Sequence, residues 1–90
     1  MGDNITIQDR VARSIMNNGG VSLKKEIVSD TGLTPGQVHM ANIRLVQRGL
    51  FKSETLKEKK RCPFVGFRMT VIDTPRVKIR MDKLLKKFEV

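Results

Sequence analysis

The run Thr34-Pro35-Gly36-Gln37 constrains the fold of this chain more than any other part of the sequence, because it marks the beginning of one helix in three ways. A threonine hydroxyl caps a first turn, a proline at the first helical position has no amide to leave unpaired, and a glutamine at the third position reaches back to the cap. Helical geometry, at about 100° per residue, then divides the following residues between two faces. The buried face is expected to carry Val38, Ala41, Asn42 and Leu45, and the exposed face Gln37, Met40, Ile43, Arg44, Gln47 and Arg48.

Two further helices are predicted before this one. The first begins after Thr6, whose hydroxyl and the Asp9 carboxylate form a capping pair, and it ends at the turn-forming run 17–20. A short extended stretch at 21–22 precedes the second helix, which Gly32 ends. The apolar positions that indicate these helices are Ile7, Val11, Ala12, Ile15 and Met16 in the first, and Leu23, Ile27 and Val28 in the second.

After Gly49 the spacing of apolar residues changes from helical to alternating, which is typical of strands. Residues 51–57 and 64–73 are expected to form a β-hairpin joined by a short polar loop. Alternation in the second strand predicts that Arg68 and Thr70 face solvent. The opposite face of that strand is expected to carry Val65, Phe67, Met69 and Val71.

The C-terminal stretch predicts a fourth, amphipathic helix, capped by Asp73 or Thr74 and opened by Pro75. The apolar stripe of this helix needs another surface to pack against. We expect a second copy of the chain to provide it, forming a homodimer that binds a palindromic site. The alternative is that the helix folds back on the first one. The stripe consists of Val77, Met81, Leu84, Leu85 and Phe88.

The net positive charge of the chain lies in its second part. The 90 residues carry a formal charge of +9, and the first 34 are neutral in sum. Residues 35–90 contain fourteen basic and five acidic side chains. Such a skew attracts polyanions, of which nucleic acid is the commonest and an anionic membrane surface the second, although it is also found in basic proteins that are merely soluble. A length of 90 residues leaves room for one domain and excludes a multidomain enzyme.

Little in the sequence indicates catalysis or a cofactor. One histidine, His39, and one cysteine, Cys62, are too few ligands for zinc, and no acidic pair has a spacing that forces two carboxylates onto one face. No apolar run approaches the roughly 20 residues that cross a bilayer. We expect a non-enzymatic cytoplasmic protein, nucleoid-associated if prokaryotic or phage, without metal, cofactor, small-molecule ligand or membrane contact.

The order helix, short extended piece, helix, tight turn, helix and basic hairpin resembles the winged helix-turn-helix superfamily over residues 6–73. The matching residues are Leu33-Thr34 before the third helix, Val38 and Leu45 on its buried side, and Gly49-Leu50-Phe51 leading into the hairpin. Many families share this pattern, including MarR-type and phage or plasmid regulators.

The resemblance implies an α+β domain of three helices with a two- or three-stranded β-hairpin wing, followed by the amphipathic helix over 74–90. It also implies that the third helix enters a major groove of duplex DNA, while the wing contacts the backbone or minor groove. The expected function is sequence-specific DNA binding by a small transcription regulator. The alternatives are a replication or recombination accessory protein, an RNA-binding winged helix, and a protein-interaction module.

The side chains suit different partners. Arg44 suits guanine and Gln37 adenine, whereas Met40 and Ile43 either touch thymine methyl groups or pack against the wing or a partner. The basic cluster of the predicted wing is also typical of a solvated loop. The expected DNA-binding residues are Thr34, Gly36, Gln37, His39, Met40, Arg44, Gln47, Arg48, Lys57, Lys59, Lys60 and Arg61.

Overall fold

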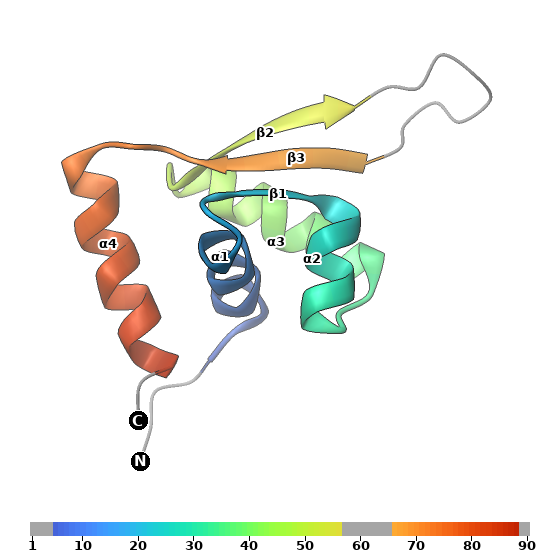
Figure 1. Ribbon diagram of the computed structural model, residues 1–90, viewed down its shortest axis with the longest axis horizontal. Helices are drawn as coiled ribbons and strands as arrows, with labels where there is room; N and C mark the ends of the chain where they lie inside the picture. The colour runs from blue at the N-terminus through green and yellow to red at the C-terminus, as the bar shows by residue number, and fades with distance from the viewer. Residues whose placement is uncertain (1–4, 57–65, 89–90) are drawn as a thin grey trace.

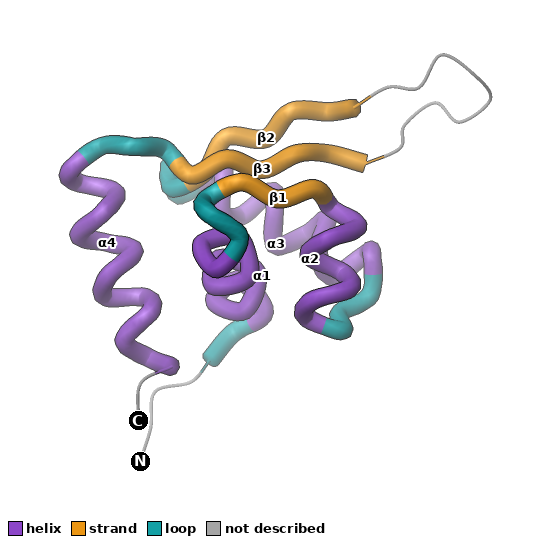
Figure 2. Tube along the Cα trace, in the orientation of Figure 1, coloured by secondary structure: helices purple, strands orange, loops and turns teal. Residues whose placement is uncertain are grey.

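The computed structural model describes residues 5–56 and 66–88, which form an α+β domain with one three-stranded antiparallel sheet (Figure 1). The helices α1, α2 and α3 lie on one face of the sheet, and α4 stands at one end of the molecule beside α1 (Figure 2). The elements are α1 Ile7–Asn17, β1 Val21–Leu23, α2 Lys24–Thr31, α3 Pro35–Gln47, β2 Phe51–Leu56, β3 Gly66–Val71 and α4 Pro75–Leu85, followed by a 3₁₀ turn at Lys86–Phe88.

The helices begin where the sequence places hydroxyl caps. The Thr6 hydroxyl accepts a hydrogen bond from the Asp9 amide at 3.2 Å, and the Asp9 carboxylate accepts one from the Thr6 amide at 3.0 Å. Thr34 caps α3 in the same way, and Thr74 rather than Asp73 caps α4. These side chains satisfy amides that have no partner within the first turn. The predicted starts of α1, α3 and α4 are therefore confirmed.

The sheet has the order β1-β3-β2, so β3 lies in the middle. The short extended stretch after α1 supplies the third strand, and its Ser22 lies opposite Met69, which also faces Ser53 of β2. Gly20 makes this close approach possible. Its φ is +89°, and a Cβ there would lie 2.9 Å from a methyl group of Val71, whose amide donates to the Gly20 carbonyl at 2.8 Å.

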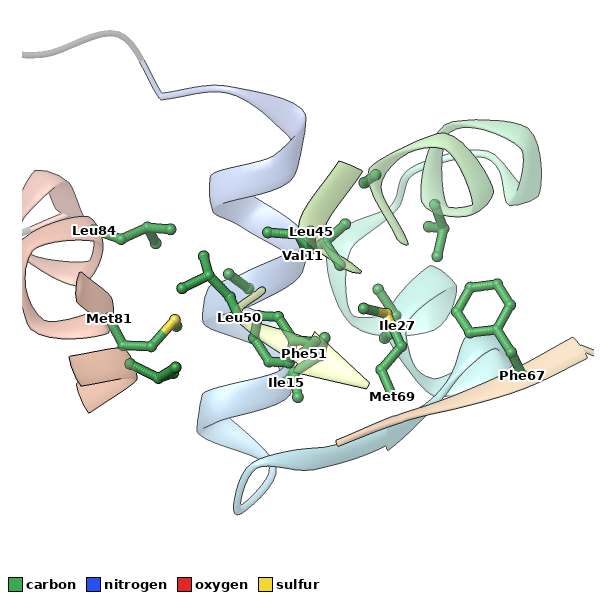
Figure 3. Close-up of a cluster of buried hydrophobic side chains, with 14 residues drawn as sticks. Val11, Ile15, Ile27, Leu45, Leu50, Phe51, Phe67, Met69, Met81 and Leu84 are labelled. Carbon is green, nitrogen blue, oxygen red and sulfur yellow. The ribbon is translucent and has the colours of Figure 1, made fainter. Parts of the chain in front are cut away.

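The core lies between the sheet and the helices, and every helix and the two longer strands contribute to it (Figure 3). Phe51 and Leu50, which follow α3, are fully buried between α1 and β3 side chains. The predicted division of α3 is confirmed, because Val38, Ala41, Asn42 and Leu45 are its buried residues. Burial of the three apolar side chains among them fixes the rotation of α3 about its axis.

Several local predictions differ from the structure. Leu23 was expected in the second helix, but it is the last residue of β1 and precedes the first turn of α2. Ile7 was expected on the apolar face of α1 but is 39% exposed, because it lies in the first turn, before the helix reaches the core. The second hairpin strand was expected to reach residue 73, yet β3 ends at Val71. One further ladder bond joins the Ile72 amide to the Leu50 carbonyl, and the chain then turns into the cap of α4. Residues 57–65, including Val65, lie outside the described part of the chain.

The stripe of α4 is covered by the chain itself. Val77, Met81 and Leu84 are buried, and Met81 and Leu84 point from α4 toward α1 and Leu50 (Figure 3). Leu85 and Phe88 are partly buried against the same core. Val77, Met81 and Leu84 were expected to pack against a second copy, and this is corrected, because they are buried within the chain. The alternative prediction, that the helix folds back on the first one, fits these three residues.

Two polar contacts hold the end of α4 against α1. Lys87 Nζ lies 3.1 Å from an oxygen of the buried Asp9 carboxylate, and the Arg13 guanidinium lies 4.7 Å above the Phe88 ring. Both contacts join residues more than seventy positions apart in the sequence. Within 5–56 and 66–88, no helix is long and apolar enough to cross a membrane.

Candidate nucleic-acid interface

The outward face of α3 carries the residues that the sequence assigned to DNA. Gln37, His39, Met40, Arg44, Gln47 and Arg48 are all exposed. Three apolar side chains share this side of the helix: Met40 is 50% exposed, Ile43 37% and Val46 39%. Because the opposite side of α3 packs into the core, the helix presents one fixed set of side chains to solvent.

The N-terminal end of α3 uses two of the predicted site residues for its own cap. The Thr34 hydroxyl accepts from the Gln37 amide at 3.1 Å, and the Gln37 side-chain oxygen accepts from the Thr34 amide at 3.0 Å. A glutamine that reads adenine needs both its oxygen and its amino group. The capping bond that the sequence predicts is therefore confirmed, and pairing of Gln37 with adenine would compete with it.

A shallow hollow lies between the first turn of α1 and the first half of α3. Its described lining contains no acidic residue, and its one charged side chain is Arg44. The first turns of both helices border it, so the positive ends of two helix dipoles lie next to an arginine. The lining residues are Thr6, Ile7, Gln8, Thr34, Gly36, Gln37, Met40, Ala41 and Arg44.

The three α1 residues in this hollow were missed by the sequence analysis. Thr6 was interpreted only as a cap and Ile7 only as a core residue, and Gln8 had no predicted role. Their proximity to α3 results from the packing of α1 against α3, which no local pattern reports.

A strip of three arginines runs along the flank of α3 that faces α1 and α4. Arg44 lines the hollow, and the Arg48 guanidinium donates to the Gln8 side-chain oxygen at 3.2 Å. The Arg80 guanidinium, from α4, donates to the Arg48 carbonyl at 3.3 Å. We call Arg44, Arg48 and Arg80 the basic strip. Arg80 was not predicted, because its contact with α3 joins residues 32 positions apart.

The other flank of α3 packs against the hairpin. The His39 ring lies 6.4 Å from the Phe67 ring, centroid to centroid, and the Asn42 amide donates to the Ser53 hydroxyl at 3.1 Å. The Asn42 side-chain oxygen is buried and has no hydrogen-bond partner within residues 5–56 and 66–88. Phe67 is paired with Thr55, close to the point where the hairpin leaves the described residues. The β2–β3 hairpin therefore runs beside α3 (Figure 1).

The opposite face of the sheet points away from the helices and carries exposed charged residues. Arg68 and Glu54 face each other across the ladder and form an ion pair at 2.6 Å. Both groups are largely exposed, so this pair contributes little to stability. The predicted orientation of Arg68 is confirmed, and Thr70 is half-buried.

Four of the predicted site residues cannot be placed. Lys57, Lys59, Lys60 and Arg61 lie outside the described residues, as does Cys62.

Comparison with protein-family models, curated proteins and solved structures finds no match for this chain. The geometry of α3 and its two flanks is therefore the basis on which a function is proposed.

Proposed function

We propose that the chain is a winged helix-turn-helix protein that binds duplex DNA in a sequence-specific manner and acts as a small transcription regulator. The observation that supports this proposal best is the position of α3 between the β2–β3 hairpin and the basic strip. The hairpin packs along one flank and the basic strip follows the other, so the outward face of α3 lies between them. A cationic side of this shape fits a polyanionic rod.

In the proposed complex α3 lies in the major groove, whose width of about 12 Å admits one helix. Arg44 reads base edges, because it projects from the outward face next to the hollow, and guanine offers it two acceptors. Arg48 and Arg80 contact phosphates, as do Lys57, Lys59, Lys60 and Arg61 of the wing. Phosphate contacts fix the position of the helix, and the residues on its outward face select the sequence.

The test is the salt dependence of duplex binding by the wild-type chain and by three single variants. If six phosphates are contacted, log K is expected to fall against log salt with a slope of about −5. Arg48→Ala is expected to weaken binding to all duplexes and to reduce that slope by about 1. Arg44→Ala is expected to weaken binding about tenfold or more on the preferred duplex and to relax sequence preference.

The matched control is Arg10→Ala, which removes the same charge. Arg10 is an exposed residue of α1 that lines a separate hollow with Asp30 and Phe88. Its loss is expected to leave affinity nearly unchanged. Equal weakening by Arg10→Ala and Arg48→Ala would show that net charge alone, and not this side of the molecule, attracts the DNA.

Two other functions use the same surface. An RNA-binding winged helix would be revealed if unlabelled RNA displaced a bound duplex as well as DNA does. A protein-interaction module is favoured by one specific observation, the exposure of Met40, Ile43 and Val46 on α3. Full duplex binding after replacement of both Arg44 and Arg48 by alanine would show that this surface is not the DNA contact face and would leave it to a protein partner.

A further inference from the structure

The centre of the outward face of α3 is apolar. At about 100° per residue, Gly36, Met40, Ile43 and Gln47 are the positions that point most directly away from the buried side. Met40 and Ile43 are one turn apart on this line, and they are 50% and 37% exposed. The arginines lie on the flank of this line and not at its centre. Whatever approaches α3 head-on therefore meets a thioether and a branched alkyl side chain first.

In a major groove one base substituent suits such side chains. The groove edges of guanine, cytosine and adenine present hydrogen-bonding atoms, and thymine adds a C5 methyl group. Pressing Met40 and Ile43 against polar edges would strip water from donors and acceptors without replacing their hydrogen bonds. Pressing them against thymine methyl groups buries apolar surface on both sides.

A second feature of the same line is Gly36. Its φ is not in the left-handed region, and a Cβ there would meet nothing nearer than the Thr34 hydroxyl oxygen at 4.0 Å. The packing of the described residues therefore does not require a glycine at this position, although glycine weakens a helix. Without a side chain at Gly36, the first turn leaves room for a groove edge to approach the backbone beside Met40.

We propose that α3 recognises thymine methyl groups, so that the preferred duplex carries A·T pairs opposite Met40 and Ile43. This inference rests on the proposed function and specifies its substrate. Arg48 and Arg80 hold the helix in the groove through phosphates, Arg44 reads a neighbouring base pair, and the apolar pair selects thymine. The same bases without their methyl groups retain their hydrogen-bonding edges and lose the contact.

The experiment compares a duplex of alternating dA and dT with one of alternating dA and dU, at one salt concentration, by fluorescence anisotropy. The second duplex differs from the first in its missing methyl groups. Each contacted methyl group is expected to account for about a fourfold difference in affinity, so two contacts give more than tenfold. The variant Met40→Ala/Ile43→Ala is expected to bind the two duplexes equally.

The matched control is Ile79→Ala, which removes an apolar side chain of α4 that is 59% exposed. It is expected to keep the preference for thymine. Equal binding of both duplexes by the wild-type chain would overturn the inference and leave the proposed function standing. Absence of binding to either duplex and to a dG·dC duplex would overturn the proposed function as well. Unchanged preference in the double variant would contradict the inference and favour a protein partner for the apolar pair.

Discussion

Single residues on α3 divide between those that pack into the fold and those that face outward. Gly36 belongs to the second group, since the described residues around it leave space for a side chain. Gly36→Ala is expected to raise the free energy of unfolding by about 0.5 kcal/mol, because alanine restricts the unfolded chain and favours the helix. It is also expected to weaken duplex binding, because the added methyl group meets the groove edge.

This account of Gly36 predicts that the alanine variant is more stable than the wild-type chain but binds the duplex more weakly. Chemical denaturation and anisotropy titration of the same variant measure the two. A variant that is less stable and equally tight in binding would show that the glycine serves the helix itself.

Asn42 is the polar residue on the buried side of α3. Its amino group donates to Ser53, but its oxygen is buried and has no partner among the described residues, which typically costs about 1–3 kcal/mol. Asn42→Leu is therefore expected to raise the free energy of unfolding by about 1 kcal/mol, since leucine has a similar size and no unpaired oxygen, and Ser53 is exposed to water. Denaturant titration checks it, and a loss of stability would show that the amide fixes α3 against β2.

At the scale of elements, α4 is held against α1 by a contact that involves a buried carboxylate. Asp9 is 2% exposed, caps α1 and accepts from Lys87. Lys87→Ala is expected to lower the free energy of unfolding by about 1–2 kcal/mol, less than for a fully buried pair because Lys87 is partly exposed and the Thr6 amide still binds the carboxylate. Thermal unfolding measures the loss.

The neighbouring Lys86 provides the control for that variant, because it is exposed on the same 3₁₀ turn. Lys86→Ala is expected to change the free energy of unfolding by less than about 0.5 kcal/mol. Similar losses in the two variants would mean that the charge of the C-terminal turn, and not its contact with Asp9, stabilises the fold.

The same packing of α4 makes a prediction about assembly. Since Val77, Met81 and Leu84 are buried within one chain, we expect the chain to fold without a second copy. The midpoint of thermal unfolding is expected to be independent of protein concentration. A midpoint that rises with concentration would show that the originally expected homodimer forms.

At the scale of the whole molecule, the sequence predicted most of the helices and both hairpin strands, because caps and periodicities are local. The run from Thr34 to Gln37 places α3, and its four buried residues follow from helical geometry. The predicted second strand extends two residues beyond β3. After Ile72 the chain leaves the sheet and turns into the cap of α4, which the alternating pattern does not report. What covers α4 was not predictable, because a stripe such as Val77 to Leu84 fits α1 of the same chain as well as a second copy.

In the candidate site, too, features set by neighbouring residues were predictable and contacts between distant residues were not. The six residues predicted for the exposed face of α3 are exposed, and Val46, which is 39% exposed, was not among them. The contributions of Gln8 and Arg80 were not predicted, because each joins α3 through a contact that spans more than thirty residues. Gln37 was assigned to adenine although its oxygen closes the capping box, since the same residue type serves both purposes.

The most direct test of the central claim, that α3 and its two flanks form one DNA-binding side, is to map backbone amide NMR signals while a duplex is added. The account predicts shifts that concentrate in residues 34–48, in the first turn of α1 and around Arg80. The exposed face of α2 at Lys25, Ser29 and Asp30 is expected to stay unchanged. Shifts that concentrate on α2 and leave α3 unmoved would contradict the account.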